Sequence, residues 1–340
     1  MPTTPYLSIV TASRNDSHGG NIRERTQSFL DSLAEQCARH RLPAELVMVD
    51  WNPPADRPSL REILDTPPAS PYFTTRFITV PHEVHASLAH ADILPFFQMI
   101  AKNVGIRRAR GKFILATNID ILFSEELMAF LAEQTLQERY FYRADRHDLD
   151  VFAVPPKLFG DGLMTFCRSH VSEVQGHYGT YASGMQSPAG DPADLHTNAC
   201  GDFTLMSRRD WEQTGGYPEY ALYSIYIDGL GLYRAAAAGI RQTVLPYPLC
   251  IYHINHSGGW VLDKALCESK PSLSYDEYQA LGLSILRKRK PPARNNDKWG
   301  YNGEIFFESS FASPCRQRER EKHTMGDACI EKNGVPHATC

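Results

Sequence analysis

The sequence lacks several features that would point to particular classes of protein. No apolar run approaches the roughly 20 residues that a membrane-spanning helix needs. The start, MPTTPYLSIVTASRN, has neither the basic stretch nor the long apolar stretch of a signal peptide. The eight cysteines include no C-x-x-C pair, and no internal repeat or G-x-G-x-x-G motif is present. We therefore expect a soluble, cytoplasmic protein with free thiols and no integral membrane segment.

A large excess of charge of either sign is also missing. The 35 basic and 39 acidic side chains give a formal net charge of −4, so there is no broad basic field for nucleic acid or an anionic membrane. Nucleic acid is therefore not an expected partner. What remains is a chain of 340 residues with 42% hydrophobic and 22% charged side chains, which is typical of a globular protein with a substantial core.

The first 125 residues alternate strand-like and helix-like segments. The strand-like runs are 6–13, 44–54, 74–81 and 112–120, and the helix-like runs are 21–41 and 93–111. Strands that alternate with helices in this way predict an α/β fold, built on a doubly wound, mainly parallel sheet with helices on both faces.

The pattern changes in the second half of the chain. Residues 145–200 are rich in Gly, Pro, Ser and Asp, and we expect a long loop or flap there. Order returns over 201–260, where a short strand, two helices and a strand that ends in a His-rich loop are expected. The polar segment 310–340 has few large apolar residues and is expected to be disordered.

One apolar run is interrupted by polar residues that need an explanation. LATNIDILF (115–123) places Asn118 and Asp120 between two apolar stretches, although a buried carboxylate is costly unless it is paired or bound to a metal. Ligands of parallel α/β sheets bind outside the carboxyl ends of the strands. We therefore expect Asp120 to share one crevice with the polar residues that follow the first and second strands.

Six segments in a fixed order resemble the GT-A-fold glycosyltransferases of the family-2 type. They span about residues 6–260 and read LSIVTASRN, LVMVDWN, KNVGIRRARGKFILATNID, CGDFTLMSRRDWEQTGGYPE, YIDGLGLYRAAAAG and IYHINHSGGW. The resemblance implies a GT-A-like fold and transfer of a sugar from a nucleotide sugar, with a UDP-sugar favoured, to a hydroxyl acceptor on a glycan, lipid or small molecule. It also implies a divalent metal, Mn²⁺ or Mg²⁺, that bridges the diphosphate of the donor.

The resemblance also implies a domain organisation. Residues 1–262 would form the glycosyltransferase domain, with a nucleotide-binding half at 1–125 and an acceptor half at 126–262. Residues 263–309 would be a C-terminal extension or lid, followed by the tail 310–340.

The metal site departs from the family pattern at one position. The family ends its fourth strand with Asp-x-Asp, whereas this chain has Asn118 in the first place and keeps only Asp120 as a carboxylate ligand. Many members complete the coordination with a late histidine, and HINH offers His253 and His256. In an extended segment these two side chains point to opposite sides, so we expect one of them to bind, with His256 favoured. A chance H-x-x-H among 13 histidines is the alternative.

The remaining candidate residues also follow from the resemblance. Asp228 stands at the position of the catalytic base, which takes the proton of the acceptor hydroxyl in an inverting transfer; retention stays open, and a helix N-cap is the alternative role for Asp228. Asp50 is expected to read the base. The residues expected to bind the nucleotide sugar are Thr11, Arg14, Asn15, Asp50, Asn103, Asn118, Asp120 and Asp202. The alternative is that polar side chains of this kind only belong to exposed turns, strand ends or helix surfaces.

Two other function classes fit part of the sequence. A nucleotidyltransferase that makes a nucleotide sugar would share the doubly wound sheet, but TASRNDSHGGNIRER has its Arg and Gly in the wrong order for the signature loop. A non-catalytic relative that binds sugar nucleotides or carbohydrate is favoured by Asn118 and Ile227, because both replace carboxylates of the family.

Overall fold

The computed structural model describes residues 4–16, 18–177, 179–182, 185–186, 194–256, 269–288 and 295–311. The strands are β1 (Leu7–Ser13), β2 (Ala44–Trp51), β3 (Phe73–Val80), β4 (Phe113–Ala116), β5 (Ile121–Phe123), β6 (Tyr140–Arg143), β7 (Arg146–Leu149), β8 (Val171–Gly176), β9 (Gly179–Ala182), β10 (Met185–Gln186), β11 (Thr204–Ser207), β12 (Arg241–Val244), β13 (Ile251–His253) and β14 (Phe307–Ser310). The helices are α1 (Ile22–Arg39), α2 (Leu60–Ile63), α3 (His82–Ala86), α4 (Gln98–Arg108), α5 (Glu125–Ala132), α6 (Gly160–Ser169), α7 (Arg208–Thr214), α8 (Ile227–Ala237), α10 (Tyr275–Lys288) and the short 3-10 helix η1 (Trp299–Tyr301).

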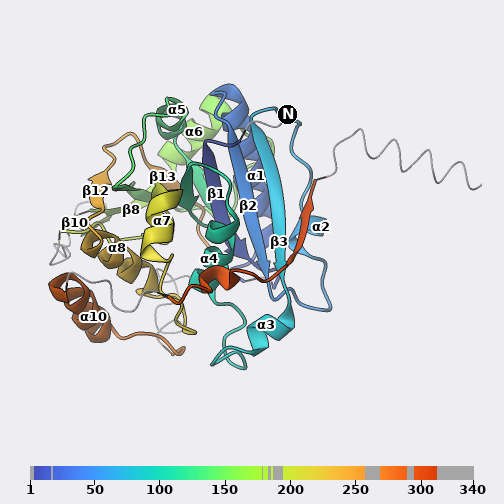
Figure 1. Cartoon of the computed structure of the whole chain (residues 1–340). Helices are drawn as coiled ribbons and strands as arrows, with labels where there is room; N and C mark the ends of the chain where they lie inside the picture. Colours follow the sequence, from blue (N-terminus) through green and yellow to red (C-terminus); the bar gives the residue numbers. More distant parts are fainter. Residues whose placement is uncertain are drawn as a thin grey trace, which may run out of the picture. The chain divides into compact units, whose positions relative to one another are not determined.

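An eight-stranded sheet carries most of the first half of the chain. Its strand order is β12-β6-β11-β4-β1-β2-β3-β14, and β4, β1, β2 and β3 are parallel neighbours. β11 is antiparallel to both β4 and β6. Figure 1 shows α1 behind β1–β3 and α4 in front of them. The predicted α/β class, with a mainly parallel sheet and helices on both faces, is confirmed.

Local sequence explains why these elements form where they do. β1 and β2 are buried on both faces, as parallel central strands are, and their sequences are mainly apolar, with Glu45 and Asp50 as the buried charged exceptions. Gly111 closes the turn between α4 and β4, where a Cβ atom would lie 2.5 Å from the backbone nitrogen of Ser8. Gly215, at φ 74°, ends α7 in the left-handed conformation that glycine adopts without strain.

A second, six-stranded sheet was not foreseen in the sequence. Its order is β10-β9-β8-β7-β13-β5, and β13 is antiparallel to β5 but parallel to β7. Only residues 117–120 separate β4 from β5, so the chain leaves the large sheet and enters the small one at Asp120. The expected strand over 112–120 is therefore shortened to β4, and residues 117–120 form the bend that leads to β5.

The expectation of a long loop over 145–200 was wrong for its first part. Residues 146–177 contain β7, α6 and β8, and only part of 178–200 has no strand or helix among the described residues. The signal was weak because β7 has four residues and directs the charged side chains of Arg146 and Asp148 toward the protein interior. A strand of this kind has no apolar alternation to detect.

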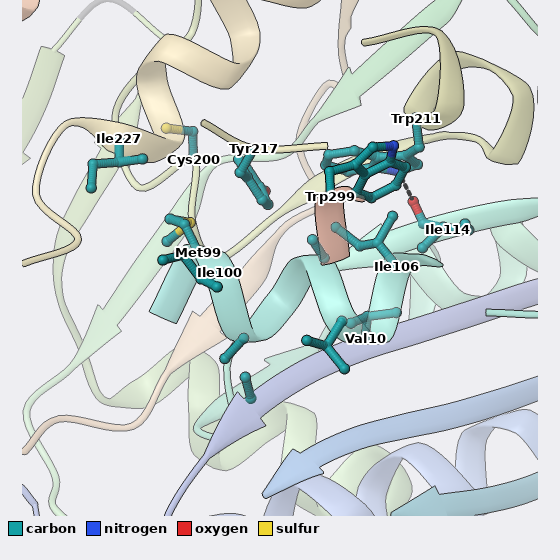
Figure 2. Close-up of a cluster of buried hydrophobic side chains, with 14 of the residues drawn as sticks. Val10, Met99, Ile100, Ile106, Ile114, Cys200, Trp211, Tyr217, Ile227 and Trp299 are labelled. Atoms are coloured by element: carbon teal, nitrogen blue, oxygen red, sulfur yellow. Dashed lines mark hydrogen bonds between the residues drawn. The ribbon is translucent and has the colours of Figure 1, made fainter. Parts of the chain in front are cut away.

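The core beside α4 joins residues from distant parts of the chain. Figure 2 shows Met99, Ile100 and Ile106 of α4 between the sheet and the side chains of Trp211, Tyr217 and Trp299. Trp211 donates its indole N–H to the carbonyl of Ile114 at 3.0 Å. Trp299 is 1% exposed, and the guanidinium of Arg107 lies 4.7 Å from its ring. The described part of the 263–309 extension thus packs against the core through Trp299.

The contacts divide the chain into residues 1–309 and residues 310–340. The predicted disordered tail lies outside the described residues, apart from its first two positions. Cys37, Cys167, Cys200 and Cys250 are buried and form no disulfide, and the other four cysteines lie outside the described residues. Among the described residues, no helix combines the length and the apolar character needed to cross a membrane.

Candidate functional site

The bend between the two sheets places Asp120 at the carboxyl end of the parallel strands. The backbone N–H of Thr117 bonds to the carbonyl of Val10 in β1 at 2.9 Å, which holds the start of the bend against that strand. The hydroxyl of Thr117 bonds to the carbonyl of Asp202 at 2.7 Å. The polar interruption in LATNIDILF is therefore the junction of the two sheets, and it presents Asp120 to the expected crevice.

Three of the predicted residues lie close enough together to hold a cation. Ligand atoms of Asp120, His253 and His256 all lie within 4.8 Å of one another. Oδ2 of Asp120 is 3.4 Å from Nε2 of His256 and 4.0 Å from Nε2 of His253. Both histidines face Asp120, because β13 ends at His253 and its alternation does not reach His256. That only one of them binds a metal stays a prediction. The backbone N–H of Ile254 instead bonds to the carbonyl of Asp120 at 2.9 Å.

The chemistry of this cluster fits a divalent metal. Oδ1 of Asp120 is buried and has no hydrogen-bond partner among the described residues, so it keeps lone pairs for another ligand. Burial alone would raise the pKa of Asp120, but His253, His256 and Arg25 outweigh it and hold the pKa below its usual value. An ionised carboxylate beside two imidazoles is a ligand set that suits transition metals. Asp120, His253 and His256 thus form the candidate metal centre.

A guanidinium shares the same carboxylate, which the sequence reading missed. Nη1 of Arg25 lies 2.6 Å from Oδ2 of Asp120, and both side chains are almost completely buried. Arg25 also donates to the carbonyls of His18 and Gly20, at 2.8 and 3.0 Å, so it fixes the loop that follows β1. A buried charge of this kind needs its partner. Arg25 therefore places a permanent positive charge beside the candidate metal centre.

The amide of Asn118, at the position where the sequence resemblance led us to expect a carboxylate, has two hydrogen-bond partners. Its nitrogen donates a short hydrogen bond to Oδ1 of Asp202, and its oxygen accepts one from Gln98 at 2.7 Å. A carboxylate at position 118 would meet the charge of Asp202 instead. Arg146 donates to the other oxygen of Asp202 at 2.6 Å. An amide at position 118 can therefore donate a hydrogen bond to Asp202, which a carboxylate at that position could not do.

Asp228 lies in the first turn of α8 and faces the loop that contains Gly201. A Cβ atom on Gly201 would lie 2.9 Å from Oδ2 of Asp228, so glycine permits this close approach. Burial raises the pKa of Asp228, against hydrogen bonds from Cys200 and the Gly229 N–H and the positive charge of Lys102. The N-cap of α8 is Tyr226, so the alternative reading of Asp228 as that N-cap does not apply.

Lys102 is a second buried cation that the sequence reading missed. Its side chain is fully buried, and its ammonium group donates to the carbonyl of Gly201 at 2.7 Å. Burial lowers its pKa to about 8, against the raising effect of Asp202 and Asp228. Lys102 therefore compensates part of the negative charge of Asp202 and Asp228.

Except for Lys102, which lies beneath the surface, these groups line one cleft of about 530 Å³. It is bordered by loops that follow β1, β4 and β13 and by the start of α8. The predicted residues that line it are Arg14, Asn118, Asp120, Asp202, Asp228, His253 and His256. His18, Arg25 and Lys270 add basic groups to the same walls, and Ile93, Phe96 and Tyr223 add apolar surface. The cleft therefore combines the candidate metal centre, a carboxylate in a helix first turn and basic groups suited to an anionic ligand.

The other predicted residues do not line this cleft in the described structure. Thr11 is fully buried within β1, and Asn15 donates its amide to the carbonyl of Pro58 at 2.9 Å. Asn103 is buried in α4 and binds both the backbone N–H and the carbonyl of Tyr217, at 2.8 and 2.9 Å. These contacts join α4 to the turn after α7. Thr11, Asn15 and Asn103 therefore belong to elements that surround the cleft, but their side chains do not line it.

Asp50 also lies behind the cleft. Its Oδ2 accepts the backbone N–H of Leu60 at the start of α2, at 2.9 Å, while Oδ1 has no partner among the described residues. The carboxyl is 1% exposed, and burial raises its pKa to about 6. The folded protein therefore binds more protons here than the unfolded chain between about pH 4 and pH 6, and ionisation above that range opposes folding.

We accordingly expect Asp50→Asn to stabilise the ligand-free protein at pH 7 by on the order of 1–2 kcal/mol and to have little effect at pH 4. The amide oxygen keeps the bond from Leu60 while the buried charge is removed. Thermal melts at the two pH values measure the difference, with Asp65→Asn as the control, because Asp65 is paired only at the exposed surface. Equal effects of Asp50→Asn at both pH values would contradict the assigned cost of ionisation.

No protein-family model and no curated protein matches the chain. Among solved structures, it is similar to the catalytic domain of Drosophila β1,4-galactosyltransferase 7 in complex with xylobiose, with 11% identity over 84% of this chain and 80% of that one and a TM-score of 0.37. It is also similar to S. aureus TarS 1-349, with 13% identity over 94% of this chain and 79% of that one and a TM-score of 0.42. A further S. aureus TarS structure matches with 14% identity over 88% of this chain and a TM-score of 0.40, and the chain spans 46% of its length. Likenesses at this level carry no inference about what the chain does.

Proposed function

We propose that the chain is a metal-dependent glycosyltransferase that moves a sugar from a nucleotide sugar, with a UDP-sugar favoured, to a hydroxyl acceptor. The observation that carries this proposal is the grouping of Asp120, His253 and His256 in a cleft that also contains Asp202 and Asp228. A cation site, a hydrogen-bonding carboxylate and a candidate base in one cleft are the parts that sugar transfer needs. A cleft of about 530 Å³ is also of a size that suits small-molecule ligands.

A divalent cation bound to these three residues would neutralise the negative charge that develops on the departing diphosphate. Asp120 would supply an oxygen ligand, and His253 and His256 would supply nitrogen ligands. Of the two cations implied by the resemblance, this mixed set favours Mn²⁺ over Mg²⁺, because Mg²⁺ takes oxygen ligands almost exclusively. Arg25 holds a further positive charge at the same point, so part of the neutralisation comes from the chain itself.

The chain's own residues would bind the rest of the donor. Arg14 and Lys270, both on the cleft wall, would contact the phosphates, and Asp202 would accept hydrogen bonds from sugar hydroxyls with its remaining lone pairs. Asp50 was predicted to read the base, but it is 1% exposed and does not line the cleft, so it would act through the start of α2, whose Leu60 N–H it binds. Thr11, Asn15 and Asn103 would act by holding the loops and helix around the donor.

Asp228 would act as the general base of an inverting transfer. The acceptor oxygen attacks the anomeric carbon while the bond from that carbon to the diphosphate breaks, and the acceptor proton passes to the carboxylate of Asp228. A base with a raised pKa holds such a proton more readily, and burial raises the pKa of Asp228. The Ile93, Phe96 and Tyr223 side of the cleft would receive the body of the acceptor.

The test is to incubate the protein with UDP-glucose, UDP-galactose and UDP-N-acetylglucosamine, each with Mn²⁺, Mg²⁺ or a chelator. We expect at least one UDP-sugar to raise the melting temperature in the presence of Mn²⁺, since a ligand that binds only the folded state stabilises it. Release of UDP should follow and should stop when the chelator removes the metal. Release of pyrophosphate from UTP would instead identify a nucleotidyltransferase, and binding without turnover over many acceptors would identify a non-catalytic binding protein.

A further inference from the structure

One face of the six-stranded sheet carries a chain of charged side chains that leads from Asp202 to the candidate metal centre. Arg146 and Asp148 are two residues apart in β7, so both point to the same face of the sheet. In the parallel register of β7 and β13, Asp148 lies directly beside His253. The pairing of these strands thus puts a carboxylate next to the imidazole that faces Asp120.

The contact between Asp148 and His253 determines which nitrogen of the imidazole carries a proton. Oδ1 of Asp148 lies 2.8 Å from Nδ1 of His253, and Asp148 is 4% exposed. The guanidinium of Arg146 contacts both oxygens of the same carboxylate, so the buried negative charge of Asp148 has a charged partner. An ionised carboxylate can only accept, and Nδ1 must therefore carry the proton. In the neutral imidazole, which is the form that binds a metal, the lone pair of His253 is then on Nε2, the atom that faces Asp120.

Arg146 holds Asp148 in place from the other side. Its guanidinium contacts both oxygens of Asp148, at 3.0 and 3.1 Å, and it donates to Asp202 at 2.6 Å. Gln175, on the neighbouring strand β8, donates to the same carboxylate at 3.2 Å. Asp148 has little freedom to rotate, because donors approach it from three strands: β7, β8 and β13.

We propose that Asp148, held by Arg146, is a positioning residue that fixes the tautomer and orientation of His253 so that its Nε2 can bind a divalent cation together with Asp120. Carboxylates that accept the second N–H of a metal-binding histidine are a general device for orienting the ring and raising its basicity. The inference rests on the proposed function, since the cation is the one proposed to assist transfer. A role limited to sheet stability would leave cation affinity unchanged.

The test is a calorimetric titration of the full chain with Mn²⁺ alone, which needs no knowledge of the donor or acceptor. Asp148→Asn should weaken Mn²⁺ binding about 10- to 100-fold, because the amide can present N–H instead of oxygen to Nδ1. Asp145→Asn is the matched control. Asp145 also pairs with a buried histidine, His196, at 2.9 Å, but that pair contacts none of the three candidate ligands. The control should bind Mn²⁺ within about twofold of wild type, since it leaves the carboxylate–histidine pair at the metal centre intact.

A double-mutant cycle shows whether Asp148 acts through His253. If it does, adding Asp148→Asn to His253→Ala should cause little further loss of Mn²⁺ affinity, although the same change is costly in the wild-type background. Melting temperatures of all four proteins, recorded without metal, separate loss of fold from loss of binding. Wild-type Mn²⁺ affinity in folded Asp148→Asn, equal losses in both backgrounds, or no Mn²⁺ binding by the wild type would overturn the inference.

The same data separate this inference from the proposed function. If no sugar is transferred but Asp148→Asn weakens Mn²⁺ binding, the function fails while the role of Asp148 stands. If Mn²⁺-dependent transfer is observed but Asp148→Asn binds Mn²⁺ as wild type does, only the role of Asp148 fails.

Discussion

Asp120→Asn is expected to lower sugar transfer by at least about 1,000-fold and to remove its response to Mn²⁺. The substitution preserves the volume of the side chain but removes the only carboxylate among the three candidate metal ligands. It also leaves Arg25 without its charge partner, which lies 2.6 Å away in the native protein. Initial rates of UDP release, measured at saturating donor over a range of Mn²⁺ concentrations, give the size of the loss.

Loss of activity in Asp120→Asn must be separated from loss of fold. A buried guanidinium whose partner is removed destabilises a protein by about 3–5 kcal/mol, so the single variant should melt well below wild type. The double variant Asp120→Asn/Arg25→Met removes both charges and should recover part of the lost stability without recovering transfer. If the double variant transfers sugar within tenfold of the wild-type rate, Asp120 has no role in metal-assisted transfer.

The first half of the fold could be predicted because local sequence determines it. β1, β2 and β3 are rich in apolar and β-branched residues and are largely buried, and their ends lie within a few residues of the predicted ones. The second sheet could not be predicted in the same way. β5 and β13 have three residues each, and their pairing joins segments more than 120 positions apart in the sequence. Short strands of this kind are specified by tertiary contacts and not by a periodic pattern.

Site residues that belong to a motif at the end of a strand could be predicted from the sequence. Charged residues that pair with distant parts of the chain were not predicted. Asp120, His253 and His256 were identified and do lie together. Arg25 left a signal that was not used: it lies three residues after Ile22 and four before Phe29, on the apolar face of α1, where a charged residue must have a buried partner. Asp148 left no such signal, because its place beside His253 follows from the register of two short strands.

Asp228→Asn is expected to lower kcat by about 100- to 10,000-fold while leaving the KM for the donor almost unchanged. The amide cannot accept the acceptor's proton, but it has the shape of the carboxylate and can keep the bond from the Gly229 N–H. Because transfer needs the ionised base, the wild-type kcat should fall as the pH drops through the raised pKa of Asp228. That acidic limb should be absent from the residual activity of the variant.

Asp276→Asn is the control for Asp228→Asn, because it tests whether replacing any aspartate in the first turn of a helix lowers kcat. Asp276 occupies that position in α10 but is exposed to solvent, so its substitution should leave kcat and its pH dependence unchanged. Folding is not expected to limit activity in Asp228→Asn, since the variant loses a buried charge that opposes folding, while Lys102 keeps its bond to the Gly201 carbonyl. An inverted anomeric configuration in the product, read by proton NMR, is the outcome that a single base requires. A product of retained configuration, or a kcat of Asp228→Asn within threefold of wild type, would show that the acceptor proton leaves by another route.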